Sequence, residues 1–569
     1  MTGRSERALQ EVLGAPTAVA LLGLAAVVRA GFVLNAGLNA DESQHLHSAW
    51  LVAQGQVPFT DFWEHHTPLL YYLLAPIARW FADSPAVYLA GRIAMVTAGA
   101  AALGLLYRAA RRLGPSVAAT AVVLLSLQPR FVEHTTEIRP DVPALVAWLA
   151  AVLALLCWRE RGRPAWLWSA GLALGLAGTL NLKAVYAALG AALAVVATCV
   201  AEVGWQAAPP RVLGALGRLG TGAAVPVLAL LAGLWLIGGT AAPVGFAEQV
   251  LGTSFRFIDP TRELPVSEEG VGLLVLALVG AVLTLRREGL GVLRHPIHGP
   301  LLVPPVVIGL LLLLPGVPAV YRHAWLPVLT AVAVYAAVAL EALIAGARAG
   351  RRGAAVLLLG AVIVGLVGPA AGSVTTALRD RNSDQLRLMR LELRHACSAE
   401  PVLDGTALAV FRPAAYRYRT LINGVRLWVA NGVIAEDAIV EEIRRSRPRV
   451  AYADWRVRAM VGPLQAFLAR HYVLRPDGLL VPGARIPVAG GPAGGREYIE
   501  LLVPGPYRLA LSPGVTAAID RTPVRPGLVE LPEGRHEVTW TGPPGMIGLT
   551  ALSCAERGPL PVPVSSGAS

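Results

Sequence analysis

Long apolar stretches recur from the start of the chain to about residue 371. With the length of about 20 residues that a hydrocarbon core requires, this pattern predicts roughly eleven transmembrane helices. The first covers residues 15–34 and the last residues 354–371. Arg4 and Arg7 precede the first stretch, and no small-residue cleavage site followed by a soluble sequence comes after it. We therefore expect a retained membrane helix rather than a removed signal peptide.

The loops between these stretches are of two kinds, which alternate along the chain. Basic clusters lie at residues 107–112, 159–163, 211–218, 286–294 and 348–352. Loops with acidic residues or histidines lie at residues 41–68, 130–141, 248–269 and 315–323, and the short loop at residues 181–183 takes its place among them. Cytoplasmic loops carry the excess of Lys and Arg, so the alternation predicts a cytoplasmic N-terminus. It places all the acidic loops, and the C-terminal region, on the non-cytoplasmic face.

The first non-cytoplasmic loop begins with a helical pattern. Asn39 followed by Glu42 is typical of a capping box, which predicts a helix over about residues 40–52. Asp41 and His45 lie one turn apart on this helix. Charge at a membrane surface is costly, so this cluster points to a membrane enzyme.

A second short helix is predicted later in the same loop. Thr67 and Pro68 suit an N-cap and a first turn, and the aromatic run that follows predicts an interfacial helix. Two in-plane helices joined by a polar turn would hold Asp41 near His66. The alternative is a loop that only covers the bundle, with its histidines satisfied by backbone groups.

Composition agrees with a membrane protein, because 55% of the residues are hydrophobic and only 15% are charged. The formal net charge is +12, but the basic residues lie between apolar spans rather than in one patch, so we expect no nucleic-acid partner. No Walker loop or dinucleotide fingerprint occurs, which argues against a nucleotide-sugar donor. We expect no cofactor, since no strong metal pattern occurs. A divalent metal at Asp41, Asp141 and neighbouring histidines is the alternative left open.

The chain changes character after about Val374. Strand-like residues 407–411, 449–452 and 479–481 alternate with helical residues 437–444 and 462–471, which predicts a small extracytoplasmic α/β domain. Short strands with turns then predict a β-sandwich-like module with a disordered tail from about Gly558. The predicted domains are therefore 1–373, 374–495 and 496–569.

Four cysteines divide between these regions. Cys157 and Cys199 lie near cytoplasmic ends of spans and are expected to be packing residues. Cys397 and Cys554 lie in the region expected outside, where oxidation is possible, and we predict a disulfide between them.

The polar motifs of the non-cytoplasmic face have the order of a known family. They are Asp41 with Glu42, residues 55–62, residues 65–72, Gly91 with Arg92, and residues 139–141, 181–183 and 321–323. In this order they resemble the GT-C superfamily of integral-membrane glycosyltransferases, in the bacterial branch related to protein O-mannosyltransferases and lipid A aminoarabinose transferases (glycosyltransferase family 39-like). The resemblance covers residues 13–343.

The resemblance implies an α-helical multi-pass GT-C fold in the bacterial cytoplasmic (inner) membrane. It implies transfer of a hexose or pentose from a polyprenyl-phosphate donor to a glycan, lipid or protein acceptor on the non-cytoplasmic face. A transporter or flippase of lipid-linked glycans is the alternative, since many spans with buried charges also suit transport. A transporter should hold its key charges near the midplane and show repeated halves, whereas here the charges gather at one interface.

Three carboxylates are the candidate catalytic residues. A carboxylate partly withdrawn from water can have a raised pKa and accept a proton near neutral pH, and the resemblance implies this base role for Asp41. It also implies that Asp141 belongs to the site. Glu42 points elsewhere on the helix and either caps it or orients a neighbour. The alternatives are that Asp41 is a helix-dipole partner and that Asp141 forms an ion pair with Arg139.

The departing phosphate requires fixed positive charge. The candidate phosphate-binding residues are His66, His65, Lys183, Arg322, His323, Tyr321 and Arg139. The resemblance places His66 where related enzymes carry Lys or His before Pro-Leu, with Thr67 where some relatives have a second proline, and His65 shares or replaces it. Lys183 either binds phosphate or extends its charge to the outer interface.

Overall fold

The computed structural model describes residues 2–252, 263, 271–293, 295–314, 317, 320–406, 408–418, 423–460 and 462–557. The chain forms two compact units, and each is described here by itself. The first unit contains Met1–Trp80 and Ala86–Asn382, and the second contains Phe81–Pro85 and Ser383–Ser569. The predicted tail from Gly558 lies outside the described residues.

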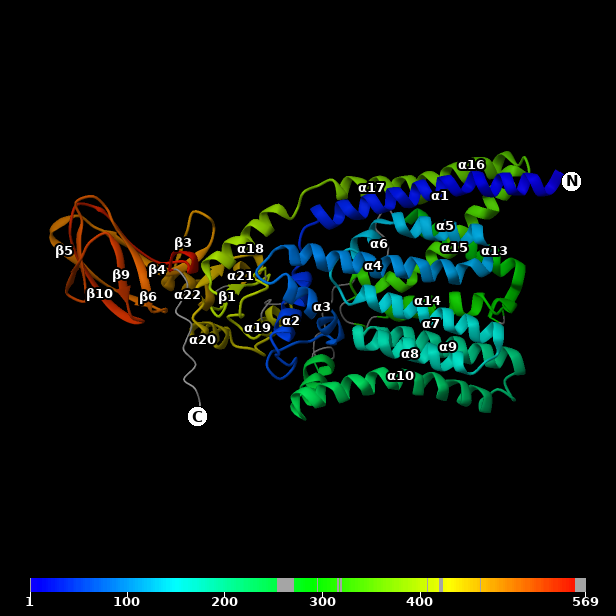
Figure 1. Ribbon diagram of the computed structural model, residues 1–569, viewed down its shortest axis with the longest axis horizontal. Helices are drawn as coiled ribbons and strands as arrows, with labels where there is room; N and C mark the ends of the chain where they lie inside the picture. The colour runs from blue at the N-terminus through cyan, green and yellow to red at the C-terminus, as the bar shows by residue number, and fades with distance from the viewer. Residues whose placement is uncertain are drawn as a thin grey trace. The chain divides into compact units, whose positions relative to one another are not determined.

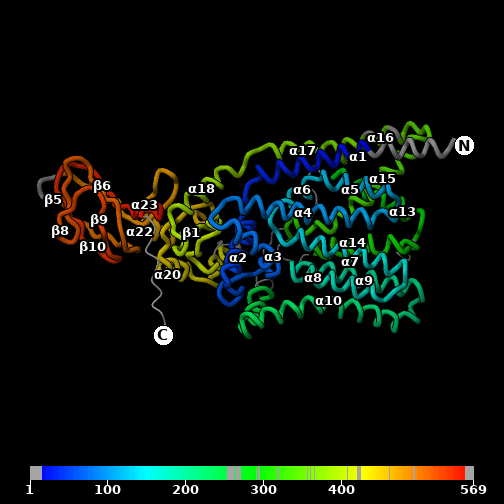
Figure 2. Tube along the Cα trace, in the orientation of Figure 1, coloured from blue at the N-terminus to red at the C-terminus, as the bar shows by residue number. Residues whose placement is uncertain are grey.

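The first unit consists of long apolar helices that lie alongside one another (Figure 1, Figure 2). They are α1 (Thr2–Asn35), α4 (Ala86–Ala110), α5 (Pro115–Leu127), α7 (Asp141–Arg161), α8 (Ala165–Leu180), α9 (Ala184–Val203), α10 (Pro209–Gly238), α13 (Val271–Glu288), α14 (His298–Leu313), α15 (Leu326–Arg348), α16 (Arg352–Val362) and α17 (Gly368–Ala377). Within the described residues, seven helical segments are long and apolar enough to cross a membrane, and three shorter apolar helices accompany them. The count of eleven stays a prediction.

The helices differ in how deeply they are packed. Of the most apolar 18-residue stretch of α7, 67% is buried inside the protein, whereas only 11% of the corresponding stretch of α10 is buried. Central α7 therefore faces other helices on most sides, whereas α10 presents leucine and valine side chains outward, as a lipid-facing helix does. Small residues allow close approach elsewhere: a side chain at Gly280 of α13 would collide with the carbonyl oxygen of Tyr335 on α15.

Two short helices follow α1, as the sequence predicts. Helix α2 (Ala40–Ala53) begins with the expected capping box, in which the Asn39 backbone amide donates to Glu42 Oε2 at 2.9 Å. Helix α3 (Leu69–Trp80) begins directly after Pro68 and packs against α2. Buried residues line most of α2, so this polar helix is fixed within the unit.

The second unit begins with helix α18 (Ser383–His395) and combines helices with two sheets. Its other helices are α19 (Asn423–Ala430), α20 (Glu436–Ser446), α21 (Trp455–Ala459), α22 (Pro463–His471) and α23 (Cys554–Arg557). One sheet has the order β1-β2-β4-β11-β6-β9 with β3 on β4, and the other the order β5-β10-β7-β8. Strands β1 (Val402–Asp404) and β2 (Val450–Tyr452) are parallel.

The remaining strands are β3 (Tyr472–Leu474), β4 (Leu480–Val488), β5 (Gly491–Leu501), β6 (Gly505–Leu511), β7 (Thr516–Ile519), β8 (Thr522–Val524), β9 (Gly527–Leu531), β10 (Gly534–Gly542) and β11 (Gly545–Ala551). Side chains of both sheets, including Ile486, Tyr507, Val538 and Ile547, form one apolar core, as in a sandwich. Strand β4 pairs with β2 and β3 as well as β11, so the first sheet runs through both predicted modules. The three-domain division stays a prediction, and its boundary at residue 495 lies within β5.

One predicted strand in this unit is wrong. Residues 408–411 form no strand, and Ala407 lies outside the described residues. The apolar side chains of 408–411 are buried, but Asp404 accepts hydrogen bonds from the backbone amides of Thr406 and Ala409, which turns the chain after β1. An apolar run of this length therefore indicated burial and not an extended backbone.

The predicted disulfide between Cys397 and Cys554 is confirmed, with a Cα–Cα distance of 5.2 Å. Cys157 and Cys199 are buried free thiols, as expected of packing residues.

Candidate functional site

The first turn of α2 presents Asp41 at a partly exposed position. Its carboxylate forms an ion pair with Arg139, with 2.9 Å between Arg139 Nη2 and Asp41 Oδ2. Arg139 lies between α6 (Pro129–His134) and α7, and its side chain is only 9% exposed, against 35% for that of Asp41. The first and second acidic loops of the sequence therefore meet at this pair.

Arg139 connects several charged groups. Its guanidinium lies 3.5 Å from Glu137, 3.6 Å from Asp141 and 3.4 Å from the His323 ring. Burial would lower the pKa of Arg139, but the neighbouring carboxylates outweigh burial and raise the pKa above its ordinary value. The guanidinium is therefore a fixed positive charge in a largely water-excluded site.

A second group of polar side chains continues from Asp141. Asn181 Nδ2 donates to Asp141 Oδ1 at 2.8 Å, and Asn181 Oδ1 accepts from the Lys183 backbone amide at 2.9 Å. Lys183 Nζ lies 3.3 Å from His323 Nε2 and 5.6 Å from the centre of the Tyr321 ring. Burial lowers the pKa of Lys183, against the raising effect of Asp141. Side chains from four separate predicted motifs thus share one network.

A cavity of about 50 Å³ adjoins this network. Its polar lining comes from Asp141, Asn181, Lys183 and His323. The rest of the lining is mostly apolar and comes from Ala144, Leu145, Trp148, Ala177, Ala184, Tyr186, Ala187, Ile308, Ala324, Leu326 and Pro327. A pocket with charge on one side and apolar helices on the other suits an amphiphilic ligand.

Glu42 lies in a different place from its neighbour Asp41. Its side chain is fully buried, and Arg92 of α4 donates to both carboxylate oxygens at 2.8 and 2.7 Å. Glu42 also accepts from the backbone amides of Asn39 and Ile138. These contacts join α2, α4 and the segment before α7, so Glu42 is placed to hold Asp41 and Arg139 in position.

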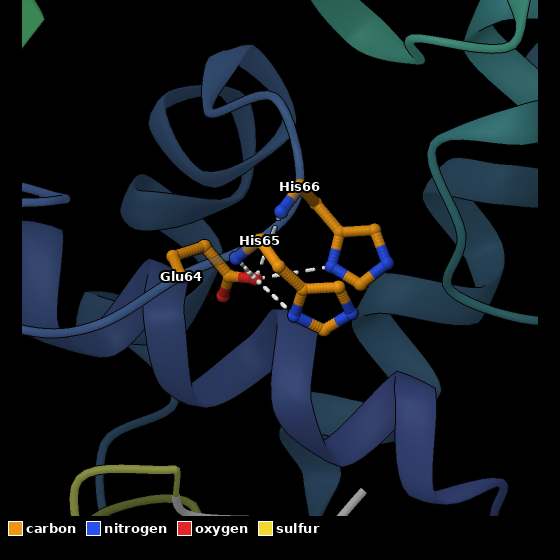
Figure 3. A group of neighbouring side chains, drawn as sticks. All are labelled: Glu64, His65 and His66. Carbon is orange, nitrogen blue, oxygen red and sulfur yellow. Dashed lines mark hydrogen bonds and ion pairs between the residues drawn. The ribbon is translucent and has the colours of Figure 1, made fainter. Parts of the chain in front are cut away.

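Sequence reasoning missed Glu64, which the structure places at the centre of the turn before α3 (Figure 3). Its Oε1 accepts from the backbone amides of His65 (2.9 Å) and His66 (3.2 Å), from His66 Nδ1 (3.0 Å) and from Gln44 (3.1 Å). Oε2 accepts from Ser48 at 2.8 Å. Burial would raise the pKa of Glu64, but the hydrogen bond from His66 and the adjacent histidines lower it below its usual range. A glutamate directly before two histidines was the available signal.

Of the two other histidines near this turn, His45 is buried, whereas the side chain of His65 is 22% exposed. Burial lowers the pKa of His45 to about 3 and, with the neighbouring His66, that of His65 to about 3. Both rings are therefore neutral near pH 7. The phosphate-binding role of His65 stays a prediction. The His45 and His66 rings are 5.0 Å apart, so the turn lies against α2. The predicted closeness of Asp41 to His66 stays a prediction.

Glu64, His65 and His66 also form the one group in the described residues whose three ligand atoms lie within 4.8 Å of one another. Carboxylate and imidazole groups suit Zn²⁺ and similar ions. Oε1 of Glu64 already accepts four hydrogen bonds, so an ion bound there would have to displace some of them.

Arg322 has a different environment from the other predicted basic residues. Its guanidinium is 43% exposed and lies 3.3 Å from Glu263, and its backbone amide donates to the same carboxylate. Among the contacts of the described residues, it pairs with Glu263 and not with the Arg139 network. Its assignment to the phosphate stays a prediction.

Comparisons with known proteins place this arrangement in a class. The family model described as dolichyl-phosphate-mannose-protein mannosyltransferase matches residues 65–219. A comparison with curated protein sequences finds no match. Solved structures do match over most of the chain, and they are integral-membrane glycosyltransferases of the GT-C type. The chain is therefore a multi-pass membrane protein with the GT-C fold.

Two solved proteins illustrate the likeness. ArnT from Cupriavidus metallidurans in the apo state is 15% identical, with a TM-score of 0.55 over 83% of this chain and 98% of that one. The same protein bound to undecaprenyl phosphate is 13% identical, with a TM-score of 0.54 over 82% and 97%. The oligosaccharyltransferase of Archaeoglobus fulgidus is 13% identical, with a TM-score of 0.50 over 82% and 74%.

Proposed function

We propose that the chain is a glycosyltransferase that moves a sugar from a polyprenyl-phosphate donor to an acceptor on the non-cytoplasmic face of a bacterial cytoplasmic membrane. The observation that carries this proposal is the Asp41–Arg139 pair with Lys183 and His323 behind it. A carboxylate that can accept a proton lies beside cations that can bind a phosphate. The match to the mannosyltransferase family and the likeness to a protein solved with undecaprenyl phosphate support the same class.

The reaction requires one bond to form and one to break. The acceptor hydroxyl oxygen forms a bond to the anomeric carbon, and the bond from that carbon to the phosphate oxygen breaks. The hydroxyl proton passes to the carboxylate of Asp41, which acts as general base. The polyprenyl phosphate leaves with the bonding electron pair and a second negative charge, stabilised by Arg139, Lys183 and His66. The acceptor is a glycan, a lipid or a protein.

Asp141 and Glu42 support this chemistry by orienting the residues that contact the substrates. Asp141 is hydrogen-bonded to Asn181 and lies 3.6 Å from Arg139, so it orients two groups that face the donor. Glu42 holds Asp41 in position through its buried ion pair with Arg92. The apolar side of the cavity suits the first isoprene units of the carrier.

The decisive experiment is transfer of labelled sugar from synthetic polyprenyl-phosphate donors by the purified chain, beside a folded Asp41→Asn variant. We expect the variant to lose about 10²–10⁴-fold in rate. Asp61→Asn, an exposed acid of the same loop, is the matched control and should transfer normally. Donor binding without cleavage by the wild-type chain, with varied acceptors, would favour the transporter alternative. Equal turnover in Asp41→Asn would refute the base assignment.

A further inference from the structure

The orientation of His66 depends on one hydrogen bond. Its Nδ1 lies 3.0 Å from Oε1 of Glu64, an oxygen that also accepts hydrogen bonds from the backbone amides of His65 and His66. Nδ1 must therefore carry the hydrogen and donate it. The other ring nitrogen, Nε2, points away from Glu64 (Figure 3). Glu64 thus engages Nδ1 of the His66 ring in a hydrogen bond and leaves Nε2 for an incoming ligand.

Glu64 is itself held firmly. Its side chain is 2% exposed, and Gln44 and Ser48 of α2 donate to its two oxygens. Its backbone amide donates to Gln249 at 3.0 Å, and Gln249 in turn donates to the Phe59 carbonyl at 2.9 Å. A carboxylate fixed from several elements is suited to fixing a neighbouring ring rather than to moving during a reaction.

The His66 side chain lies within electrostatic reach of the cationic part of the site. His66 interacts electrostatically with His323, which contacts both Arg139 and Lys183. In a protonated imidazole both nitrogens donate, so Nε2–H can bind a phosphate oxygen while Nδ1–H stays on Glu64. The hydrogen bond to Glu64 would then determine where that donor points.

We propose that Glu64 is a positioning residue for the donor phosphate, which holds the His66 ring by Nδ1 so that Nε2 addresses the phosphate. It acts through His66 and does not touch the donor. This inference rests on the proposed function, because it assumes that a polyprenyl phosphate binds beside Arg139 and Lys183. It adds a residue that the sequence motifs did not indicate.

A double-mutant cycle tests the proposal. Binding of undecaprenyl phosphate is measured for the full chain in lipid nanodiscs, for wild type, Glu64→Ala, His66→Ala and the double variant. If Glu64 acts only through His66, each single change weakens binding by about tenfold and the double change weakens it no further. Glu64→Gln keeps an acceptor oxygen for Nδ1–H and should restore part of the affinity. Asp61→Asn, an exposed acid in the same loop, should bind like wild type.

The other outcomes are distinct. Additive losses, or equal losses in Glu64→Ala and Glu64→Gln, would show a general structural role and overturn the proposal. Loss of wild-type affinity on chelation with its recovery on adding Zn²⁺ would make Glu64 a metal ligand and overturn it as well. If the wild-type chain neither binds undecaprenyl phosphate nor transfers sugar from a polyprenyl-phosphate sugar donor, the proposed function fails, and this inference with it. Should Glu64→Ala not fold, the Glu64→Gln and His66→Ala cycle gives the same comparison.

Discussion

Glu42 in the first unit, here called the membrane unit, and Glu392 in the second unit are both completely buried. They differ in whether a cation pairs with the carboxylate. Arg92 donates to both oxygens of Glu42, whereas neither oxygen of Glu392 has a hydrogen-bond partner among the described residues. Burial raises the pKa of Glu392 well above its ordinary value, and the nearby Asp404 and Asp454 raise it further. The membrane unit therefore neutralises Glu42 with the cation of Arg92, whereas the second unit neutralises Glu392 by protonation.

The difference has consequences for what each unit can do. An ion pair fixes two side chains in one geometry, which a site built from several helices requires. Protons leave the geometry less constrained but make the free energy of unfolding depend on pH. The contrast predicts that charge removal harms the membrane unit and that pH acts mainly on the second unit.

The largest expected effect follows from breaking the buried pair. Arg92→Met leaves Glu42 as an unpaired buried charge and should lower the free energy of unfolding by about 3–5 kcal/mol. Thermal unfolding in detergent measures the change, and the double variant Arg92→Met with Glu42→Met should recover part of it. An Arg92→Met protein as stable as wild type would mean that the pair does not hold α2 to α4.

The disulfide provides the next effect, confined to the second unit. Cys554→Ser should lower the free energy of unfolding by about 2–4 kcal/mol, because the bond to Cys397 restricts the unfolded chain. Reductant should lower the melting temperature of wild type and leave that of Cys554→Ser unchanged. Cys157→Ala, at a buried free thiol of the membrane unit, is the control and should keep the sensitivity to reductant.

Arg139→Gln tests whether the ion pairs of the membrane unit are functional as well as structural. Removing the cation beside Asp41 and Asp141 should slow sugar transfer by about 10²-fold, since the leaving phosphate loses electrostatic stabilisation. The rate with saturating donor is the measurement. Arg130→Gln, which breaks a partly exposed pair with Glu133, should retain the wild-type rate.

The last effect is the smallest per pH unit and concerns the pH dependence of stability. A glutamate with a raised folded-state pKa stabilises fully below its unfolded value, near 4.5, and loses that stability as pH rises toward the folded value. Glu392→Gln should remove this loss, which is about 1.4 kcal/mol per pH unit within that window. Unfolding of the full chain measured from pH 4.5 to 8 shows the slope. Burial and Asp454 raise the pKa of Asp404 to about 7, so a residual slope up to that pH should persist.

Asp384→Asn, at a 94% exposed position of α18, should leave the slope unchanged and serves as the control. A wild-type protein whose stability does not fall across this pH range would contradict the neutralisation of Glu392 by protons.

Much of the membrane unit was predictable because its determinants are local. The capping box of α2 lies within four residues, and the start of α3 after Pro68 follows from the shape of proline. The alternation of basic and acidic loops brought Asp41, Arg139 and Lys183 to one predicted face, and the structure joins them in one network. Orientation across the membrane stays a prediction.

The pairings within that face were not predictable. Nothing local distinguishes Arg92, which binds Glu42, from Arg322, which pairs with Glu263. Glu64 was overlooked for the same reason, because its partners Gln44 and Ser48 come from another helix. In the second unit, the apolar run at residues 408–411 had suggested an extended strand. The Asp404 side chain of β1 instead accepts a hydrogen bond from the Ala409 backbone amide and turns the chain.

The sequence by itself determined the apolar helices, the polar loops, the capped start of α2 and the cysteine pair, because each depends on composition, spacing or local hydrogen bonds. Tertiary structure alone decided which acid meets which base. Asp41 and Glu42 are adjacent in the chain, yet Asp41 forms an ion pair with Arg139 at a partly exposed site, whereas Glu42 forms a buried ion pair with Arg92. Successive helical residues point about 100° apart, so their partners depend on how distant helices pack.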